Sequence, residues 1–440
     1  MKVDLAKYRS RLEETASASF RGRITKVVGI LVEASGFPAT LGELCRIEKS
    51  EGGEILLAEV VGFRGDAALL MPYGDMTGIG VGAPATSLGR RFVVRVGVGL
   101  LGRVLDGFGH PIDEGEPFPV EAEIPVHREA PNPLHRVPIT EPIETGVRAI
   151  DGLITLGRGQ RIGIFSGSGI GKSTLLAQVA KGAAADVAVI ALIGERGREV
   201  QGFIREALGP EGLQRAVVVA ATSDRPPIER FKGAFVATAI AEFFRDRGKN
   251  VLFVMDSVTR FAAACREIGL ALGEPPTLKG YPPSFFATVP KLVERLGRTR
   301  SGSITGFYTV LIDADDMDDP VGDTLRGLLD GHIILSRSMA NRNHFPSIDV
   351  LASLSRLMTA VASSGHKAAA GRFRDLLTTF EENRDLVQIG AYRPGTNPKL
   401  DAALVRIQGM EAFLRQTPEH RTALAETTAL LGKLTEGYQG

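Results

Sequence analysis

A glycine-rich turn over residues 166–171 runs directly into Lys172 and Ser173. The residues before it, RIGIF (161–165), have the composition of a strand, and KSTLLAQVA after it reads as the start of a helix. Backbone N–H groups of such a turn and the amino end of the helix form a concave site for anions. The lysine places a charge on the β- and γ-phosphates of a nucleotide, and the hydroxyl after it is a ligand for Mg²⁺. The spacing therefore predicts a phosphate-binding loop for a magnesium nucleotide.

The loop departs from the pattern G-x-x-x-x-G-K-[ST] at one place, because its first glycine position holds Ser166. A small residue is compatible with the start of this turn, and the remaining glycines let the backbone approach phosphate closely. The alternative is a chance glycine-rich turn, which the flanking strand and helix argue against. We expect nucleotide contacts from Ser166, Gly167, Ser168, Gly169, Ile170, Gly171, Lys172, Ser173 and Thr174.

Two further buried-strand patterns end in a carboxylate. VAVIALIGE (187–195) ends in Glu195, which could orient and polarise an attacking water as a general base, and Arg196 beside it could contact phosphate. VLFVMD ends in Asp256, the position from which such proteins hold Mg²⁺, usually through water. A solvated charge cluster is the alternative for the first, and many strands end in aspartate. The phosphate loop favours the catalytic interpretation of both.

The composition excludes several classes of function. Lys and Arg total 52 against 51 for Asp and Glu, so no overall charge bias indicates a nucleic acid or a membrane surface as partner. The two cysteines, Cys45 and Cys265, lie far apart without metal-site spacing and are expected to be reduced thiols. No apolar run is long enough to span a bilayer, and the charged start lacks the core of a signal peptide. We expect a cytoplasmic protein.

The chain divides into four segments by its patterns. Residues 1–21 contain an amphipathic helix, which either packs on its own domain or docks a partner. Short, closely spaced strands over 22–91 predict a small β-barrel. Over 92–365, apolar strands alternate with helices, which predicts an α/β domain with a parallel sheet covered on both faces. Residues 366–440 read as a helical C-terminal domain.

Several stretches resemble the catalytic and related subunits of rotary (F/V-type) ATPases. PSIDVLASLS (346–355) fits the signature of that family, and GERGRE and MDSVTRFA are similar to its site motifs. Within the family, GEPPTLKGYPPS (273–284) and the segment 330–356 look most like type III protein export ATPases, and the barrel sequence favours the flagellum-specific group. The resemblance covers nearly the whole chain and implies a β-barrel, a RecA-like ATPase domain and a helical C-terminal domain.

The resemblance implies roles for further residues. Arg356, directly after the signature, matches the arginine finger that reaches the ATP of the next subunit. Phe345 resembles the aromatic residue that stacks on adenine, and Tyr392 in GAYRPG is a second base contact by a looser match. The family usually has Ala or Gly where this chain has Ser166, a departure that leaves the phosphate contacts intact.

The matching motifs assign the catalytic set and the metal ligands. Glu195, Lys172, Arg196 and Arg356 would carry out catalysis, and Ser173 and Asp256 would hold Mg²⁺, the latter through water. The implied function is hydrolysis of Mg-ATP by a homohexameric ring that energises flagellar protein export.

The implied partners are other copies of the chain, a stator-like regulatory protein at the N-terminal helix, a coiled-coil stalk protein in the ring, export substrates with their chaperones, and export-gate membrane proteins. Nucleic acid is not among them. The expected place is the cytoplasm, peripherally at the inner membrane.

Four alternatives remain open at this point. The chain could serve a virulence injectisome, or be the catalytic subunit of a rotary ATP synthase, whose connecting segments around 273–330 would differ. An RNA-translocating hexamer shares the RecA-like core, but the barrel has no evident aromatic RNA-stacking motif. A non-catalytic nucleotide-binding subunit would lack the carboxylate that Glu195 supplies.

Overall fold

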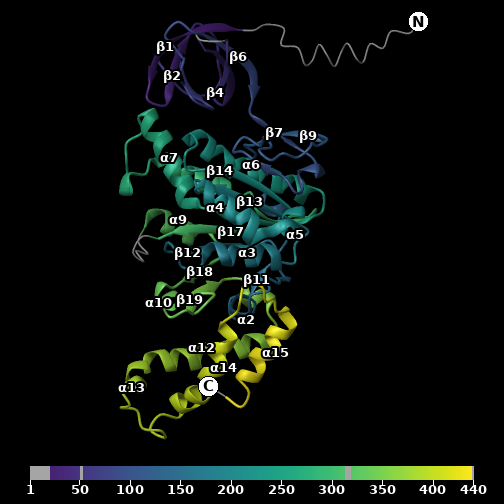
Figure 1. Ribbon diagram of the computed structural model, residues 1–440, viewed down its shortest axis with the longest axis vertical. Helices are drawn as coiled ribbons and strands as arrows, with labels where there is room; N and C mark the ends of the chain where they lie inside the picture. The colour runs from purple at the N-terminus through teal and green to yellow at the C-terminus, as the bar shows by residue number, and fades with distance from the viewer. Residues whose placement is uncertain (1–19, 50–52, 313–318, 439–440) are drawn as a thin grey trace, which may run out of the picture.

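The computed structural model describes residues 20–49, 53–312 and 319–438. Of the predicted N-terminal segment 1–21, only residues 20 and 21 fall within these ranges, so its amphipathic helix lies outside the described residues. The described parts are stacked along one long axis (Figure 1): a barrel at one end, a sheet with its helices in the middle, and a group of helices at the other end.

The barrel predicted from short strands is present. Strands β1 to β6 close it in the order β1-β2-β5-β4-β3-β6, with every neighbouring pair antiparallel. Inward side chains such as Ile24, Ile47 and Leu70 are fully buried. The strands are β1 Arg21–Val28, β2 Leu31–Ser35, β3 Glu43–Glu48, β4 Ile55–Arg64, β5 Ala67–Pro72 and β6 Pro84–Arg91.

The central sheet follows the order β19-β18-β12-β17-β15-β13-β14-β8, with β16 paired to β17. Its strands run parallel except β16 and β19, which pair antiparallel with their neighbours. The strands are β8 Val104–Leu105, β12 Arg161–Ser166, β13 Val187–Ile193, β14 Ala216–Ala221, β15 Asn250–Asp256, β16 Gly297–Arg298, β17 Ser303–Leu311, β18 Gly331–Leu335 and β19 Ile348–Ser355.

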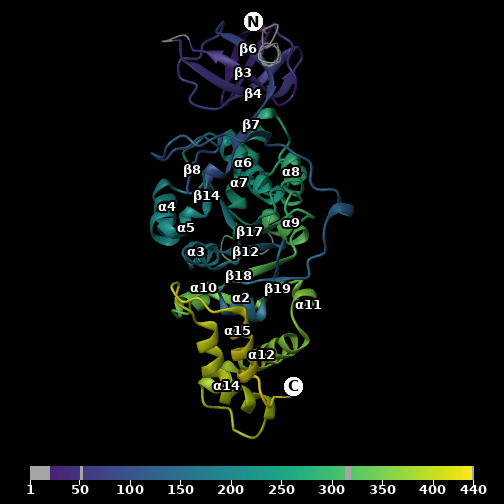
Figure 2. The same cartoon turned by 90° about the vertical axis from the view of Figure 1, so that its right-hand side faces the viewer.

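Helices cover both faces of this sheet, which is why its central strands are predominantly apolar. Val187 and Val189 of β13 pack in the cluster that includes α6, while Ala188 and Ile190 pack with α3 on the other face. Figure 2 shows α3, α4 and α5 on one side and α8 and α9 on the other. The helices are α3 Lys172–Gly182, α4 Gly197–Gly202, α5 Gly209–Gln214, α6 Pro227–Asp246, α7 Val258–Leu272, α8 Pro283–Val293, α9 Pro320–Leu328 and α10 Arg337–Asn341.

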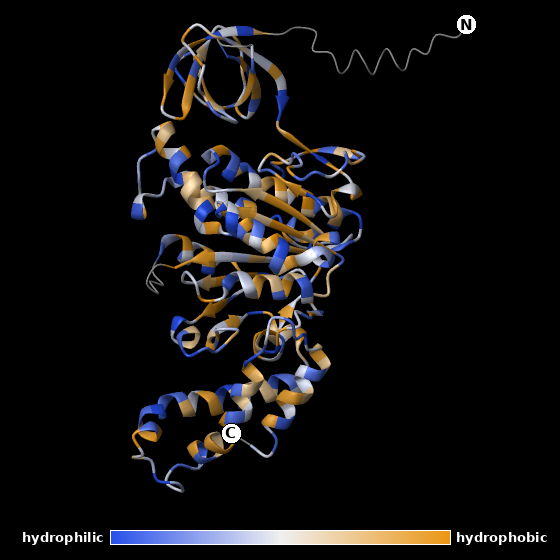
Figure 3. Cartoon of the chain, in the orientation of Figure 1, coloured by the Kyte–Doolittle hydropathy of each residue, from blue (hydrophilic) through white to orange (hydrophobic). Residues whose placement is uncertain are grey.

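The C-terminal segment is helical, as expected. It contains α12 Ser364–Glu382, α13 Arg384–Gln388, α14 Pro398–Leu414 and α15 Leu424–Leu434, and the Gly/Pro-rich break separates α13 from α14. Apolar residues of these helices join α2 (Arg148–Leu153) in the core that also holds α3. Figure 3 shows the hydrophobic colour concentrated in the strands of the barrel and the central sheet.

Short elements connect these parts. Strands β7 Val93–Val96 and β9 Ala122–Pro125 pair with each other, as do β10 Pro142–Ile143 and β11 Leu156–Gly157, and α11 is Met358–Val361. Short 3-10 helices lie at Val98–Leu100, Pro133–His135 and Leu278–Gly280, and the π-helical turn Phe203–Leu208 joins α4 to α5. None of the described helices has the length and hydrophobicity needed to cross a bilayer.

A buried ion pair ties the barrel to the central domain. The Lys232 ammonium on α6 lies 2.7 Å from the Glu59 carboxylate on β4, and both side chains are nearly inaccessible to water. Tyr73 donates a hydrogen bond to the same carboxylate at 2.5 Å, and His127 Nε2 lies 2.9 Å from the ammonium. Burial lowers the pKa of Lys232 and, together with the adjacent ammonium, that of His127 to about 3. The neutral imidazole can therefore accept a hydrogen bond from the lysine.

We expect Glu59→Gln to lower the free energy of unfolding by about 3 kcal/mol or more, because it leaves a buried ammonium without its counter-charge. The control is Glu123→Gln, since Glu123 pairs with Arg95 in an exposed bridge and should change stability by less than about 1 kcal/mol. Thermal and urea unfolding measure both. Equal destabilisation by the two variants would contradict this role of the buried pair.

Candidate active site

The phosphate loop has the local geometry that its sequence predicts. It joins the end of β12 to the start of α3, and Gly169 and Gly171 adopt φ of +77° and +91°, where residues with a side chain are strained. Ser166 is the last residue of β12, is 1% exposed, and accepts a hydrogen bond from the Ile312 backbone. Its hydroxyl is buried without a hydrogen-bond partner in the described chain. Ser166 therefore fills a small packed space at the start of the turn.

The family-like segment before β19 holds the loop in place. The Ser347 hydroxyl donates to the Ile170 carbonyl at 2.7 Å. The Phe345 ring lies against Gly171, where an added Cβ would stand 3.4 Å from it. The ring is 40% exposed, so one part packs on the loop while another part faces solvent. The structure thus brings Phe345 to the loop, and its stacking on adenine stays a prediction.

Three charges meet beside the loop. The Lys172 ammonium forms an ion pair with Asp256 and lies 3.7 Å from Glu195 Oε1. The Thr309 hydroxyl on β17 donates to the Asp256 carboxylate at 2.7 Å. The residues come from α3 and from the ends of β13 and β15, and the carboxyl ends of parallel strands share one edge of a sheet. The fold therefore brings together Lys172, Glu195 and Asp256, which the sequence motifs had each selected as site residues.

Glu195 has the acid–base property that a general base needs. Burial raises its pKa to about 7, the negative charge of Asp256 and a hydrogen bond with Glu199 add to the increase, and the Lys172 ammonium opposes it. The same hydrogen bond holds the pKa of Glu199 below its usual value. A carboxylate with a pKa close to neutrality can take a proton from water at physiological pH.

Arg196 lies next to this cluster but points elsewhere. Its guanidinium pairs with Glu199 at 3.4 Å, and its side chain is 75% exposed. A side chain so exposed and weakly paired is free to reorient toward a bound phosphate. The phosphate contact of Arg196 stays a prediction.

A cavity of about 670 Å³ opens beside the start of α3, a volume typical of ligand pockets. Its walls include Ser173, Thr174 and Gln178 of α3, the segment 145–147, and residues 418–421 from the C-terminal domain. Gln178 donates to the Thr417 carbonyl at 3.0 Å, which joins α3 to that segment. The cavity therefore adjoins Ser173 and Thr174, which directly follow the glycine-rich turn and Lys172.

Gln416 connects the C-terminal wall of this cavity to the rest of the site. Its backbone N–H donates to the Phe345 carbonyl at 2.9 Å, and its amide donates to the carbonyls of Gly146 and His420. Its side-chain oxygen accepts the Arg148 backbone N–H. Sequence reasoning missed this segment because no motif marks it. Pro418 lies between α14 and α15, and a proline there indicates an irregular segment but not a binding site.

Tyr392 is not brought to the site. It lies in the loop between α13 and α14, and its hydroxyl donates to the Asn397 carbonyl and the Asp401 carboxylate at the start of α14. It does not line the cavity beside α3, whose C-terminal wall is residues 418–421 instead. The looser match of GAYRPG therefore selected a residue that organises its own loop.

Arg356 lies at the opposite edge of the sheet from the loop of its own chain. It follows the antiparallel strand β19, and its backbone N–H donates to the Asp330 carbonyl. The Asp330 carboxylate pairs with Arg161, the first residue of β12, whereas the loop begins after the last. Six strand residues span roughly 20 Å, farther than an arginine side chain reaches. In this chain Arg356 is therefore separated from the residues that its predicted role requires.

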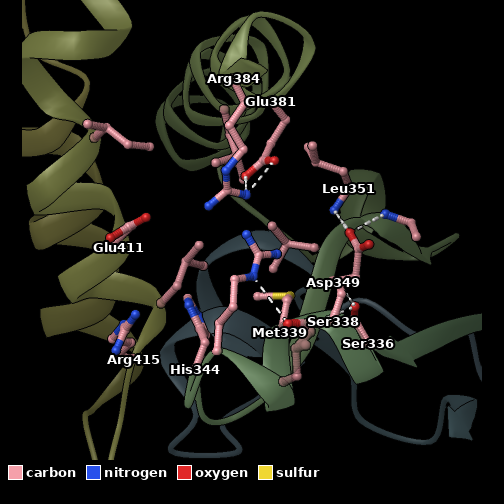
Figure 4. A pocket seen from close by; sticks show the side chains of 17 residues that line it. Ser336, Ser338, Met339, His344, Asp349, Leu351, Glu381, Arg384, Glu411 and Arg415 are labelled. Atoms are coloured by element: carbon pink, nitrogen blue, oxygen red, sulfur yellow. Dashed lines mark hydrogen bonds and ion pairs between the residues drawn. The ribbon is translucent and has the colours of Figure 1, made fainter. Parts of the chain in front are cut away.

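A second cavity, of about 430 Å³, lies between the α10–β19 region and helices α12 to α14 (Figure 4). Its lining includes His344, Arg384, Glu411 and Arg415, which Figure 4 labels, and no residue of the phosphate loop. Burial lowers the pKa of His344, whose Nε2 has no hydrogen-bond partner in the described chain. The cavity separates the central domain from the C-terminal helices and is not the candidate active site.

Comparison with known proteins places this geometry in a family. The model of the ATP synthase alpha/beta family, nucleotide-binding domain, matches residues 146–355, and that of its beta-barrel domain matches 24–89. The model of the T3SS EscN ATPase C-terminal domain matches 362–433. The flagellum-specific ATP synthase of Bacillus subtilis (strain 168) is 49% identical over 96% of this chain and 97% of its own. The chain belongs to the ATP synthase alpha/beta family.

Type III secretion ATPases of that family are similar to this chain as well. The type 3 secretion system ATPase of Xanthomonas euvesicatoria is 51% identical over 94% of both chains. The solved structure of the assembled ATPase EscN from enteropathogenic E. coli is 44% identical, with a TM-score of 0.89 over 94% of this chain and 100% of that one. The expected family and fold are confirmed, and the chain is an ATP-hydrolysing enzyme of this group.

The residues at the cluster fit a magnesium ion bound with its substrate. Ser173 presents an exposed hydroxyl at the cavity and Asp256 a buried carboxylate. Glu195 Oε1 is buried without a hydrogen-bond partner, so it is available as an acceptor. Across the described ranges, no group of three or more His, Cys, Asp or Glu side chains could hold a metal by itself. Mg²⁺ typically takes one or two carboxylates and relies on substrate phosphates for the rest.

We expect Glu199→Gln to shift the acid limb of the ATPase pH profile to lower pH. The carboxyl of Glu195 is half protonated near its pKa of about 7, so a general base at this position loses activity as the pH falls through neutrality. Removing the Glu199 carboxylate removes a cause of that raised pKa. At pH 6 the variant should retain a several-fold larger fraction of its maximal kcat than the wild type.

Steady-state kcat at saturating ATP, from pH 5.5 to 8.5, measures this shift. Glu211→Gln on α5 is the control, because its carboxylate lies outside the cluster, and its profile should match the wild type. An unshifted acid limb in Glu199→Gln would show that the limb belongs to another group.

Proposed function

We propose that this chain hydrolyses Mg-ATP as a subunit of a homohexameric ring, and that the ring energises protein export through the flagellar type III apparatus. One observation carries the proposal: a single chain holds both halves of a composite site, at opposite edges of one sheet. The loop, Glu195 and Asp256 lie at one edge, and Arg356 lies at the other. Identical chains packed head to tail bring the two halves together, and such contacts close into rings.

In the proposed reaction, each residue acts on a different part of the substrate. Lys172 exchanges its ion pair with Asp256 for the β- and γ-phosphates, which would leave the Asp256 carboxylate free to hold Mg²⁺ through water. Glu195 takes a proton from the attacking water. Ser173, and Asp256 through water, would hold Mg²⁺, which would supply neutralisation of charge on the β- and γ-phosphates. Arg196 stabilises the leaving phosphate, and Arg356 of the adjacent subunit stabilises charge in the transition state.

An aromatic ring and a cavity lie beside the loop where we propose that the adenine nucleoside binds. Phe345 packs on Gly171 and keeps part of its ring exposed. The 670 Å³ cavity between α3 and residues 418–421 provides room for the nucleoside. Phe345 does not line this cavity, so we assign the adenine contact to Phe345 from its packing on the loop, and the nucleoside pocket to the cavity with its C-terminal wall.

The flagellar assignment and the partners extend this proposal. Similarity to the flagellum-specific ATP synthases of B. subtilis and Treponema pallidum, and the barrel sequence, support the flagellar role. The solved complex of EscN with its central stalk EscO, similar at a TM-score of 0.87, supports a coiled-coil stalk in the ring. Residues 1–21 would dock a stator-like protein, and 366–440 would meet substrates, chaperones and export-gate proteins. The ring would work in the cytoplasm, peripherally at the inner membrane.

We expect Arg356→Ala to lower kcat for ATP by about 10³-fold or more, the usual worth of an arginine finger. Binding of Mg-ATP to the isolated chain should change by less than about threefold, since Arg356 is remote from the loop of its own chain. Arg300→Ala is the control, because Arg300 is also exposed but lies outside both half-sites. Turnover assays and calorimetric titration measure the two quantities.

The flagellar role is tested in cells that lack the chromosomal copy of the gene. The wild-type chain should restore swimming and Glu195→Gln should not. A strain that swims normally without the chain and instead loses injectisome secretion would overturn the flagellar assignment while leaving the ATPase intact.

A further inference from the structure

Arg337 contacts the phosphate loop, although it belongs to none of the motifs found in the sequence. It follows β18 and begins α10, at the same edge of the sheet as the loop. A Cβ placed on Gly167 would lie only 2.6 Å from Nη2 of Arg337. Gly167 does not have a positive φ, so its backbone conformation alone does not favour glycine. The guanidinium therefore occupies the space beside Gly167, and a side chain at this position would make the end of Arg337 shift.

This guanidinium has no protein partner. Within the described part of the chain, Arg337 makes no hydrogen bond, ion pair or ring contact, and its side chain is exposed. Two arginines at the opposite edge of the sheet differ: Arg161 pairs with Asp330, and Arg356 donates to the Arg326 carbonyl. A guanidinium presents a planar array of N–H donors that matches phosphate geometry. An unpaired one beside an anion-binding loop has donors available for a ligand.

The direction of the nucleotide places its terminal phosphate near Arg337. The cavity assigned to the nucleoside adjoins Ser173 and Thr174, at the α3 end of the loop. Gly167 lies at the β12 end of the loop. A phosphate chain that starts at the cavity and follows the loop thus ends close to Gly167.

We propose that Arg337 is a phosphate-binding residue for its own chain, donating to the terminal phosphate of Mg-ATP. The inference rests on the proposed nucleotide function of the loop. Two arginines then flank the β18–β19 pair at its opposite edges: Arg337 serves the site of its own chain, and Arg356 serves the neighbour's. Because ADP lacks the terminal phosphate, Arg337 distinguishes substrate from product.

The test measures Mg-ATP and Mg-ADP binding calorimetrically in the non-hydrolysing Glu195→Gln background. Adding Arg337→Gln should weaken Mg-ATP binding about tenfold and Mg-ADP binding less than twofold. Arg337→Lys should keep part of the preference for ATP. Arg342→Gln, directly after α10 and bonded to the Ser338 carbonyl, is the matched control and should leave both affinities within twofold. The measurement is made at protein concentrations where the chain is monomeric, since the contact is within one chain.

A second variant tests the same contact from the loop side. Gly167→Ala displaces the guanidinium, so it should reduce Mg-ATP binding selectively, and combining it with Arg337→Gln should add little further loss. Equal weakening of ATP and ADP by Arg337→Gln, no weakening, or an effect confined to assembled rings would each overturn the inference. Absence of nucleotide binding by the Glu195→Gln parent would instead contradict the proposed function. Thermal unfolding checks that each variant is folded.

Discussion

The ammonium of Lys172, held between the Asp256 and Glu195 carboxylates, is the interaction on which the site depends. Two buried carboxylates close together would repel each other and favour protonation, and the lysine charge offsets that repulsion. Burial and the Asp256 charge nevertheless keep the pKa of Glu195 near 7. The cluster thus places Lys172 to bind phosphate, Asp256 to hold Mg²⁺ and Glu195 to accept a proton from water.

The parallel sheet and two side-chain links fix the position of this cluster relative to the phosphate loop and the C-terminal domain. β12, β13 and β15 end at one edge, which fixes the loop, Glu195 and Asp256 relative to one another. The Ser347 hydroxyl fixes the loop to the segment before β19, and Gln416 fixes the same segment to the C-terminal domain through the Phe345 carbonyl. Movement of the C-terminal helices would thus change the wall of the nucleoside cavity, which couples that domain to occupancy of the site.

Local sequence patterns predicted the features of the site that neighbouring residues in the sequence determine. The glycine spacing predicted the loop, and strand ends in a parallel sheet predicted that Glu195 and Asp256 would meet. The cavity wall at 418–421 is positioned by contacts between residues more than 200 apart in the sequence, such as Gln416 with Gly146, and no local pattern encodes these. Tyr392 was selected by a loose match and bonds within its own loop. Ser166 was interpreted as a tolerated small residue, and its burial at the end of β12 explains why size matters there.

The central claim is that each active site is completed by the arginine of a neighbouring copy. Glu195→Gln and Arg356→Ala, each inactive alone, are mixed at equal amounts and assembled into rings. In a head-to-tail ring about one quarter of the interfaces then join an intact Glu195 to an intact Arg356, so we predict recovery of about one quarter of wild-type ATPase activity. Rings shown by mass photometry and native mass spectrometry to contain both variants, yet without recovered activity, would contradict the account.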